Sequence, residues 1–256
     1  MKTAFIILSF LGLTLFGGKD ANVESKVYSF SKARTEKTDF GTVRQMIDNS
    51  TTHMENFEIH ATTVNPGKML EDNGQFMGFE RMIVVKDGIL NVSVDGKTRE
   101  MNAGSVALLM PNNRYKIENS GKSSSTFYFV KYKSKQPVNF ERARFSGGPM
   151  LLCWDSIKFT PHDKGGVRKY FDRKSAMSDR IEMHVTTLNP QIKSHEPHTH
   201  FPAEIVIMMD GKTEMEIGGK IYPGTVGDIY FLGSNIPHAI RNTGEEPCMY
   251  MAFQWQ

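Results

Sequence analysis

The sequence is poor in cysteine and carries almost no excess charge. Its 256 residues include only Cys153 and Cys248, too few for a disulfide framework and without the paired spacing of a zinc ribbon or a CxxC redox site. These two thiols are either free or joined in one bridge. Lysine and arginine exceed aspartate and glutamate by 31 − 28 = 3, with both signs interleaved. Because phosphate recognition needs a concentrated basic excess, we expect no nucleic-acid partner.

Long apolar runs are also missing, except at the start of the chain. Met1-Lys2 precedes an apolar run over residues 4–16, which ends at Gly17-Gly18. This order predicts a signal peptide over residues 1–18, and the alternative is a buried N-terminal strand or helix. The run is shorter than the roughly 20 residues that cross a bilayer. We therefore expect a secreted or periplasmic protein without a membrane anchor.

The chain contains an internal duplication. Three pairs of segments match, at offsets of 124, 124 and 123 residues: 41–48 with 165–172, 60–66 with 184–190, and 104–119 with 227–242. Such a period is far longer than a solenoid repeat of roughly 20 to 50 residues. Each copy is therefore expected to be a domain with its own core. We predict domains at residues 28–132 and 155–256, joined by a linker at 133–154.

Each copy consists of short alternating runs rich in β-branched and aromatic residues. In the first copy these runs, which predict strands, are residues 57–64, 81–85, 89–94, 105–110 and 126–132. Asp-Gly and Gly-Gly pairs between the runs supply hairpin turns. Antiparallel strands of this kind close into barrels or jelly rolls. The predicted fold class is therefore all-β, with two tandem jelly-roll barrels.

The second copy contains a cluster of metal-ligand residue types. His198, His200 and Glu204 share parity, so in an extended chain they can converge on one face if strand pairing continues through Pro202. His238 follows in the later part of the same copy. Three imidazoles and one carboxylate suit a divalent transition metal (Mn, Fe, Zn or Ni) and leave coordination positions open for a ligand.

These residues resemble the two motifs of the cupin superfamily. His198, His200, Glu204 and Gly211 fit the first motif. The second motif is matched by a set that lacks the usual turn proline: Gly227, Gly233-Ser234-Asn235, His238 and Asn242. The resemblance covers both copies and implies a bicupin with its metal motif only in the C-terminal barrel. Across the superfamily the motif pair is specific for fold and metal but not for reaction.

The first copy lacks the proposed ligands. At the 123-residue offset the four ligand positions hold other residue types: Gln75, Met77, Arg81 and Tyr115. A one-residue shift would instead place Glu80 opposite Glu204. We interpret this domain as a structural partner, and the alternative is an anion pocket built on Arg81 with Gln75 and Tyr115.

Residues that recur in both copies are interpreted as structural. These pairs are Arg44/Arg168, Asp48/Asp172 and His60/His184, and the arginine and aspartate are expected to form ion pairs. His184 is therefore not assigned as a ligand. His195 has the opposite parity and should point away or lie at the rim. Tyr230 and Gln254 are candidates for contacts with the ligands or substrate.

The expected function is that of an exported metal-dependent enzyme acting on a small polar molecule such as a hydroxy acid, keto acid or sugar derivative. Isomerase, lyase, decarboxylase and dioxygenase chemistry all remain open. The alternative is a non-catalytic binding or storage-like cupin protein. Oxalate decarboxylases, which resemble the chain as bicupins, carry metal in both barrels and so fit imperfectly. A homodimer is a further expectation, because barrel edges are exposed.

Overall fold

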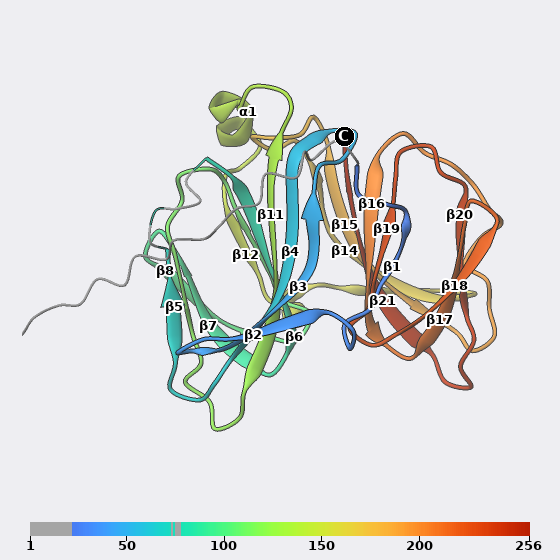
Figure 1. Ribbon diagram of the computed structural model, residues 1–256, viewed down its shortest axis with the longest axis horizontal. Helices are drawn as coiled ribbons and strands as arrows, with labels where there is room; N and C mark the ends of the chain where they lie inside the picture. Colours follow the sequence, from blue (N-terminus) through green and yellow to red (C-terminus); the bar gives the residue numbers. More distant parts are fainter. Residues whose placement is uncertain (1–21, 73, 75–77) are drawn as a thin grey trace, which may run out of the picture.

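The computed structural model describes residues 22–72, 74 and 78–256, so the expected signal peptide lies outside the described residues. The fold is almost entirely antiparallel β and comprises two jelly-roll barrels side by side (Figure 1). Within the described ranges, none of the helices has the length and apolar character needed to span a membrane. Both cysteines are free thiols.

The N-terminal barrel is built from a seven-stranded and a four-stranded sheet. The seven strands are, in spatial order, β12 (Met150–Leu152), β9 (Val106–Leu109), β6 (Glu80–Asp87), β11 (Ser125–Ser134), β4 (Met54–Val64), β3 (Gly41–Asn49) and β2 (Arg34–Lys37). The other sheet contains β5 (Met69–Glu71), β10 (Tyr115–Glu118), β7 (Ile89–Val94) and β8 (Lys97–Asn102). All five predicted strands of this copy are present.

The C-terminal barrel repeats this plan. Its seven-stranded sheet has the order β1 (Lys26–Tyr28), β19 (Ile229–Leu232), β16 (Ala203–Asp210), β21 (Cys248–Trp255), β15 (Ile181–Leu188), β14 (Gly165–Arg173) and β13 (Phe159–His162). The smaller sheet contains β18 (Lys220–Thr225), β17 (Lys212–Ile217) and β20 (His238–Asn242). The duplication seen in the sequence is therefore a duplication of topology.

Each barrel receives one edge strand from the segment that precedes the other barrel. β1 pairs with β19 of the C-terminal barrel, and β12 pairs with β9 of the N-terminal barrel. In Figure 1 the blue β1 accordingly lies beside the orange strands β16 and β19. The expected linker at 133–154 thus contains the end of β11, the short helix α1 (Phe140–Phe145) and β12, while the 3₁₀ turn η1 (Trp154–Ser156) begins at its last residue. This reciprocal exchange has no signal in the spacing of the motifs.

The largest apolar cluster lies between the barrels. It joins the facing sides of the two seven-stranded sheets, where Phe57 stacks on Trp255 with ring centroids 4.7 Å apart. Tyr132 and Phe253 approach to 6.1 Å in the same layer. Each barrel also has its own smaller interior cluster. The domains therefore do have separate cores, but they share a third one, and aromatic pairs of this kind add to the free energy gained by burial.

The recurring arginines do not pair with the recurring aspartates as predicted. The Arg168 guanidinium lies 4.2 Å from the Trp154 ring, and that of Arg44 lies 4.8 Å from the Phe30 ring. Asp172 instead binds Arg180, with Nη2 and Oδ2 2.8 Å apart. Both aromatic rings follow an exchanged strand. The arginines thus hold the exchanged segments by cation–π contacts. The recurrence of arginine and aspartate in the sequence does not reveal this role.

Candidate metal centre

The histidine cluster lies where the loop over residues 189–202 meets β20. His198 and His238 form an isolated antiparallel bridge, with N···O distances of 3.2 and 3.0 Å. β16 begins only at Ala203, so strand pairing does not continue through Pro202. The predicted parity along one strand is therefore wrong, although the side chains do converge. The backbone bridge to His238 positions the loop instead.

Three imidazoles and one carboxylate approach one another closely. The ligand nitrogens of His198, His200 and His238 all lie within 4.8 Å of one another. Glu204 Oε2 lies 3.0 Å from His200 Nε2 and 3.6 Å from His238 Nε2. Donor atoms bound to one transition-metal ion at about 2.1 Å lie roughly 3–4 Å apart. The three imidazoles are therefore close enough to share one ion, with Glu204 beside two of them.

Backbone carbonyls orient two of the rings. Nδ1 of His200 lies 2.8 Å from the Pro202 carbonyl oxygen, and Nδ1 of His238 lies 2.8 Å from that of Ile236. A carbonyl oxygen only accepts, so Nδ1 carries the proton in both rings. Nε2 is then the ligand atom, and it faces Glu204. Such hydrogen bonds from the far nitrogen are typical of metal-binding histidines.

The electrostatics of the cluster also suit a cation. Burial, together with the neighbouring imidazoles, lowers the pKa of His198 and of His238, which keeps these rings neutral. The hydrogen bond to Glu204 raises the pKa of His200. For Glu204 burial opposes ionisation, but the hydrogen bond from His200 and the neighbouring imidazoles outweigh it and lower the pKa. A proton shared by His200 and Glu204 occupies the position for which a metal ion would compete.

Comparisons with known proteins identify the kind of domain that holds these residues. The cupin domain family matches residues 184–253, which run from β15 to β21. Oxalate decarboxylase from Lactobacillus farciminis, solved as a formate complex, is similar in structure with a TM-score of 0.72 at 15% identity, over 92% of this chain and 87% of that one. The chain has the bicupin fold, and its C-terminal barrel contains a cupin domain.

Two further solved structures share the bicupin fold. A mutant of oxalate decarboxylase OxdC from Bacillus subtilis has a TM-score of 0.69 at 14% identity, over 93% of this chain and 79% of that one. The protein Ylba from E. coli has a TM-score of 0.71 at 14% identity, over 94% and 96%. At these identities the likeness concerns the fold alone. A sequence search among curated proteins finds no significant match.

Gln254 and Tyr230, the two candidates for contacts with the ligands or substrate, lie in different surroundings. Gln254 Nε2 donates to Glu204 Oε2 at 3.3 Å and lines the pocket, as expected of such a contact. The Tyr230 hydroxyl lies 3.0 Å from Thr213 Oγ1 within the interior apolar cluster of the barrel. Tyr230 is not among the residues that line the pocket. Its hydroxyl therefore satisfies a core contact rather than the site.

His195 lies at the rim of this pocket. Its exposed ring stands at 90° to that of His198, with centroids 4.2 Å apart, and its Nδ1 donates to the Glu196 carbonyl oxygen at 3.0 Å. The position agrees with the rim alternative rather than with a ring turned away. Its parity carries no information, because this part of the chain is a loop.

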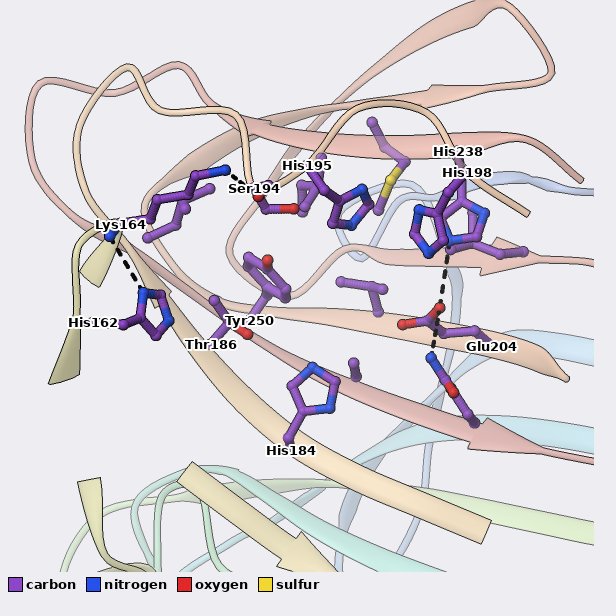
Figure 2. Close-up of a pocket in the computed structure, with 17 residues that line it drawn as sticks. His162, Lys164, His184, Thr186, Ser194, His195, His198, Glu204, His238 and Tyr250 are labelled. Carbon is purple, nitrogen blue, oxygen red and sulfur yellow. Dashed lines mark hydrogen bonds and ion pairs between the residues drawn. The ribbon is translucent and has the colours of Figure 1, made fainter. Parts of the chain in front are cut away.

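Several polar residues of the pocket have no motif in the sequence. His184 Nδ1 lies 2.9 Å from Glu182 Oε1, and the His184 ring faces the interior of the barrel (Figure 2). Burial opposes the charge on His184, but the hydrogen bond to Glu182 outweighs it and raises the pKa. The shared parity of positions 182 and 184 on β15 was a usable signal for this pair. The other polar lining residues include Thr186, Ser194, Tyr250, His162 and Lys164.

The corresponding position in the N-terminal barrel of the bicupin is closed by an ion pair. Arg81 and Glu204 occupy the same register, opposite Leu109 and Leu232 respectively. This settles the one-residue ambiguity against Glu80. Arg81 is fully buried, its Nη1 lies 3.0 Å from Asp72 Oδ2, and its guanidinium lies over the Tyr115 ring.

The alternative of an anion pocket on Arg81 loses its main support. Asp72 neutralises the guanidinium, and the second terminal nitrogen of Arg81, Nη2, donates to the Asn113 carbonyl oxygen. Gln75 and Met77, the other counterparts of ligand residues, lie outside the described residues. The structural interpretation of the N-terminal barrel thus agrees with the contacts of Arg81.

Proposed function

We propose that this bicupin is an exported, metal-dependent enzyme for a small polar substrate, with one divalent transition metal in the C-terminal barrel. His198, His200, Glu204 and His238 would hold the ion. The observation that carries the proposal is the convergence of these donors, with the Nδ1 atoms of His200 and His238 fixed by carbonyl oxygens. Export rests on the apolar pattern of residues 1–18 alone.

The metal ion, when bound, supplies positive charge that polarises a carbonyl or carboxylate oxygen of the substrate. The protein supplies a pocket of about 310 Å³ that also contains Tyr250 and Thr186. A volume of this size is at the lower end of small-molecule sites. Oxalate decarboxylases of the same fold, including one in complex with formate, support the choice of a small acid or related molecule.

His184 is the proton-transfer group in this proposal. Glu182 fixes its orientation from the same strand and favours the imidazolium form, while Nε2 remains available on the other side of the ring. A histidine of this kind can donate a proton to, or accept one from, a bound substrate. This group distinguishes the enzyme from a storage-like protein, which needs no residue to move a proton.

Elemental analysis of the purified protein tests the metal site. We expect about one divalent ion per chain, and its loss in His200→Ala and in His238→Ala with circular dichroism unchanged. Tyr115→Phe, at the position of the N-terminal barrel that corresponds to His238, is the matched control and should retain the ion. Wild-type protein without metal after dialysis against each candidate ion would refute the proposal.

A substrate panel of hydroxy acids, keto acids and sugar derivatives tests the catalytic part. His184→Asn is expected to lower kcat about 10²- to 10⁴-fold with metal content unchanged. His60→Asn, the equivalent change in the other barrel, should leave activity intact. Equal rates for His184→Asn and the wild type would remove His184 from the mechanism.

A further inference from the structure

The pocket extends well beyond the metal donors that line it, His198, Glu204 and His238. Figure 2 shows Lys164 and His162 at one end and His198, His238 and Glu204 at the other, with Tyr250 and Thr186 between them. The volume of about 310 Å³ is many times the roughly 10–15 Å³ that a cavity needs to hold one water molecule. A ligand that fills this space contacts groups at both ends.

Lys164 brings a positive charge to the far end. Its Nζ donates to the Ser194 carbonyl oxygen at 2.7 Å, which holds the half-buried ammonium against the pocket wall. Over the described part of the chain no carboxylate lies within ion-pair distance of this ammonium. The nearby acid, Asp163, has a side chain that is 90% exposed and lies 3.8 Å from His162 Nδ1. Because Lys164 carries a charge that its carbonyl contact does not neutralise, an anion is the ligand group that it favours.

The other barrel lacks this cation. The backbone N–H of Asn189 donates to the Lys164 carbonyl oxygen at 2.9 Å, and that of Asn65 donates to the Phe40 carbonyl oxygen at 2.9 Å. The two hairpins therefore correspond in register, and Phe40 stands where Lys164 stands. The lysine occurs only in the barrel that has the large pocket and the metal donors.

We propose that the substrate is an elongated organic acid whose distal carboxylate binds Lys164 while oxygen atoms at its other end reach the metal donors. This inference rests on the proposed function and narrows its substrate class. A two-carbon acid has no chain with which to span the two groups. The distal carboxylate would accept a charge-assisted hydrogen bond from Lys164, while the oxygen atoms at the other end of the acid reach the metal donors.

Calorimetric titration with a series of linear dicarboxylates, from oxalate to adipate, tests the inference. It is run on metal-loaded and metal-free wild type, Lys164→Met and Lys164→Arg. We expect the wild type to prefer the longer acids, and Lys164→Met to lose at least about tenfold in affinity for them while its oxalate affinity stays unchanged. Lys164→Arg should recover most of the loss.

The controls separate this inference from the proposed function. Lys164→Met should keep the metal content and melting temperature of the wild type, which excludes a folding defect as the cause. Equal affinities of the wild type and Lys164→Met for the longer acids, or no binding of any acid to the wild type, would overturn the inference. Failure of the metal site would appear separately, as absence of metal from the wild-type protein.

Discussion

Lys131 and Gln254 occupy corresponding positions on β11 and β21, next to Arg81 and Glu204 respectively. In the N-terminal barrel Lys131 Nζ binds Glu58 Oε2 at 2.7 Å, and Arg81 binds Asp72 at 3.0 Å. Its interior charges are therefore paired within the protein. In the C-terminal barrel the uncharged Gln254 leaves Glu204 to the histidines.

The difference shows how one backbone yields a closed barrel and an open one. A buried charge must be compensated, either by another side chain or by a ligand. The N-terminal barrel uses side chains, while the C-terminal barrel presents lone pairs of nitrogen and oxygen around a pocket. The two barrels also differ in the pKa of the histidine in a recurring Glu-x-His pair, which lies on β4 in one barrel and on β15 in the other. Burial, with the charge of Lys131 adding to it, lowers the pKa of His60, whereas the hydrogen bond to Glu182 raises that of His184.

The largest effect is expected from breaking the ion pair that closes the N-terminal barrel. Arg81→Met leaves the buried Asp72 carboxylate without its partner and should lower the free energy of unfolding by about 3–5 kcal/mol. Urea denaturation measures the change. Asp72→Leu with Arg81→Met should recover most of it, since no charge remains buried, and the exposed Arg99→Met should have little effect. A loss below about 1 kcal/mol for Arg81→Met would show that the pair does not close the barrel.

The second-largest expected effect is a pH dependence of stability that is caused by Glu80. The counterpart of Glu80 in the C-terminal barrel is Ala203. Glu80 is fully buried between the barrels, where Oε2 accepts hydrogen bonds from Ser175 Oγ at 2.8 Å and from the Met177 N–H at 3.1 Å. Tyr132 and Arg173 are the other titratable groups that influence it. Burial raises the pKa of Glu80 to about 7.

The raised pKa predicts a loss of stability with increasing pH. Between pH 4.5 and about 7 the unfolded chain releases the proton of Glu80 while the folded protein keeps it, so the free energy of unfolding falls by roughly 3 kcal/mol. Glu80→Gln cannot ionise and should abolish this part of the slope in urea denaturation at each pH. Glu71→Gln, at an exposed position, is the control. An unchanged pH profile in Glu80→Gln would contradict the assignment.

The smallest expected effect is a change in the pKa of His60, which belongs to one of the two Glu-x-His pairs. Lys131→Met removes the charge that competes for Glu58, so the pKa of His60 should rise in the direction of His184. An NMR titration of the histidine Cε1 protons measures it. Lys133→Met, which removes an exposed partner of Glu55 on the same strand, should leave His60 unchanged. A fall in the pKa of His60 would mean that Lys131 does not cause the difference.

Much of the fold could be predicted because the repeat and the period-two patterns are local signals. The segments at 41–48 and 165–172 occupy the same strand, β3 and β14, in the two barrels. The exchange of β1 and β12 could not be predicted, because pairing between distant edges leaves no trace in spacing. Residue type predicts an aspartate partner for the recurring Arg168, but its partner is Trp154, because residue type alone does not reveal a cation–π contact.

The candidate site was predicted less evenly than the fold. The spacing identifies four candidate ligands: His198, His200, Glu204 and His238. Their side chains converge because of a loop and an isolated β-bridge rather than because they share one strand. Lys164 and His184 were missed as pocket residues. Lys164 enters the pocket from a hairpin more than thirty residues before the cluster, a relation that only the folded structure reveals.

Anomalous scattering from crystals grown with Mn²⁺ tests the difference between the barrels most directly. We expect one strong peak among His198, His200, Glu204 and His238, and none beside Arg81 and Asp72. Absence of density at the histidines, or a peak in the N-terminal barrel, would contradict this expectation.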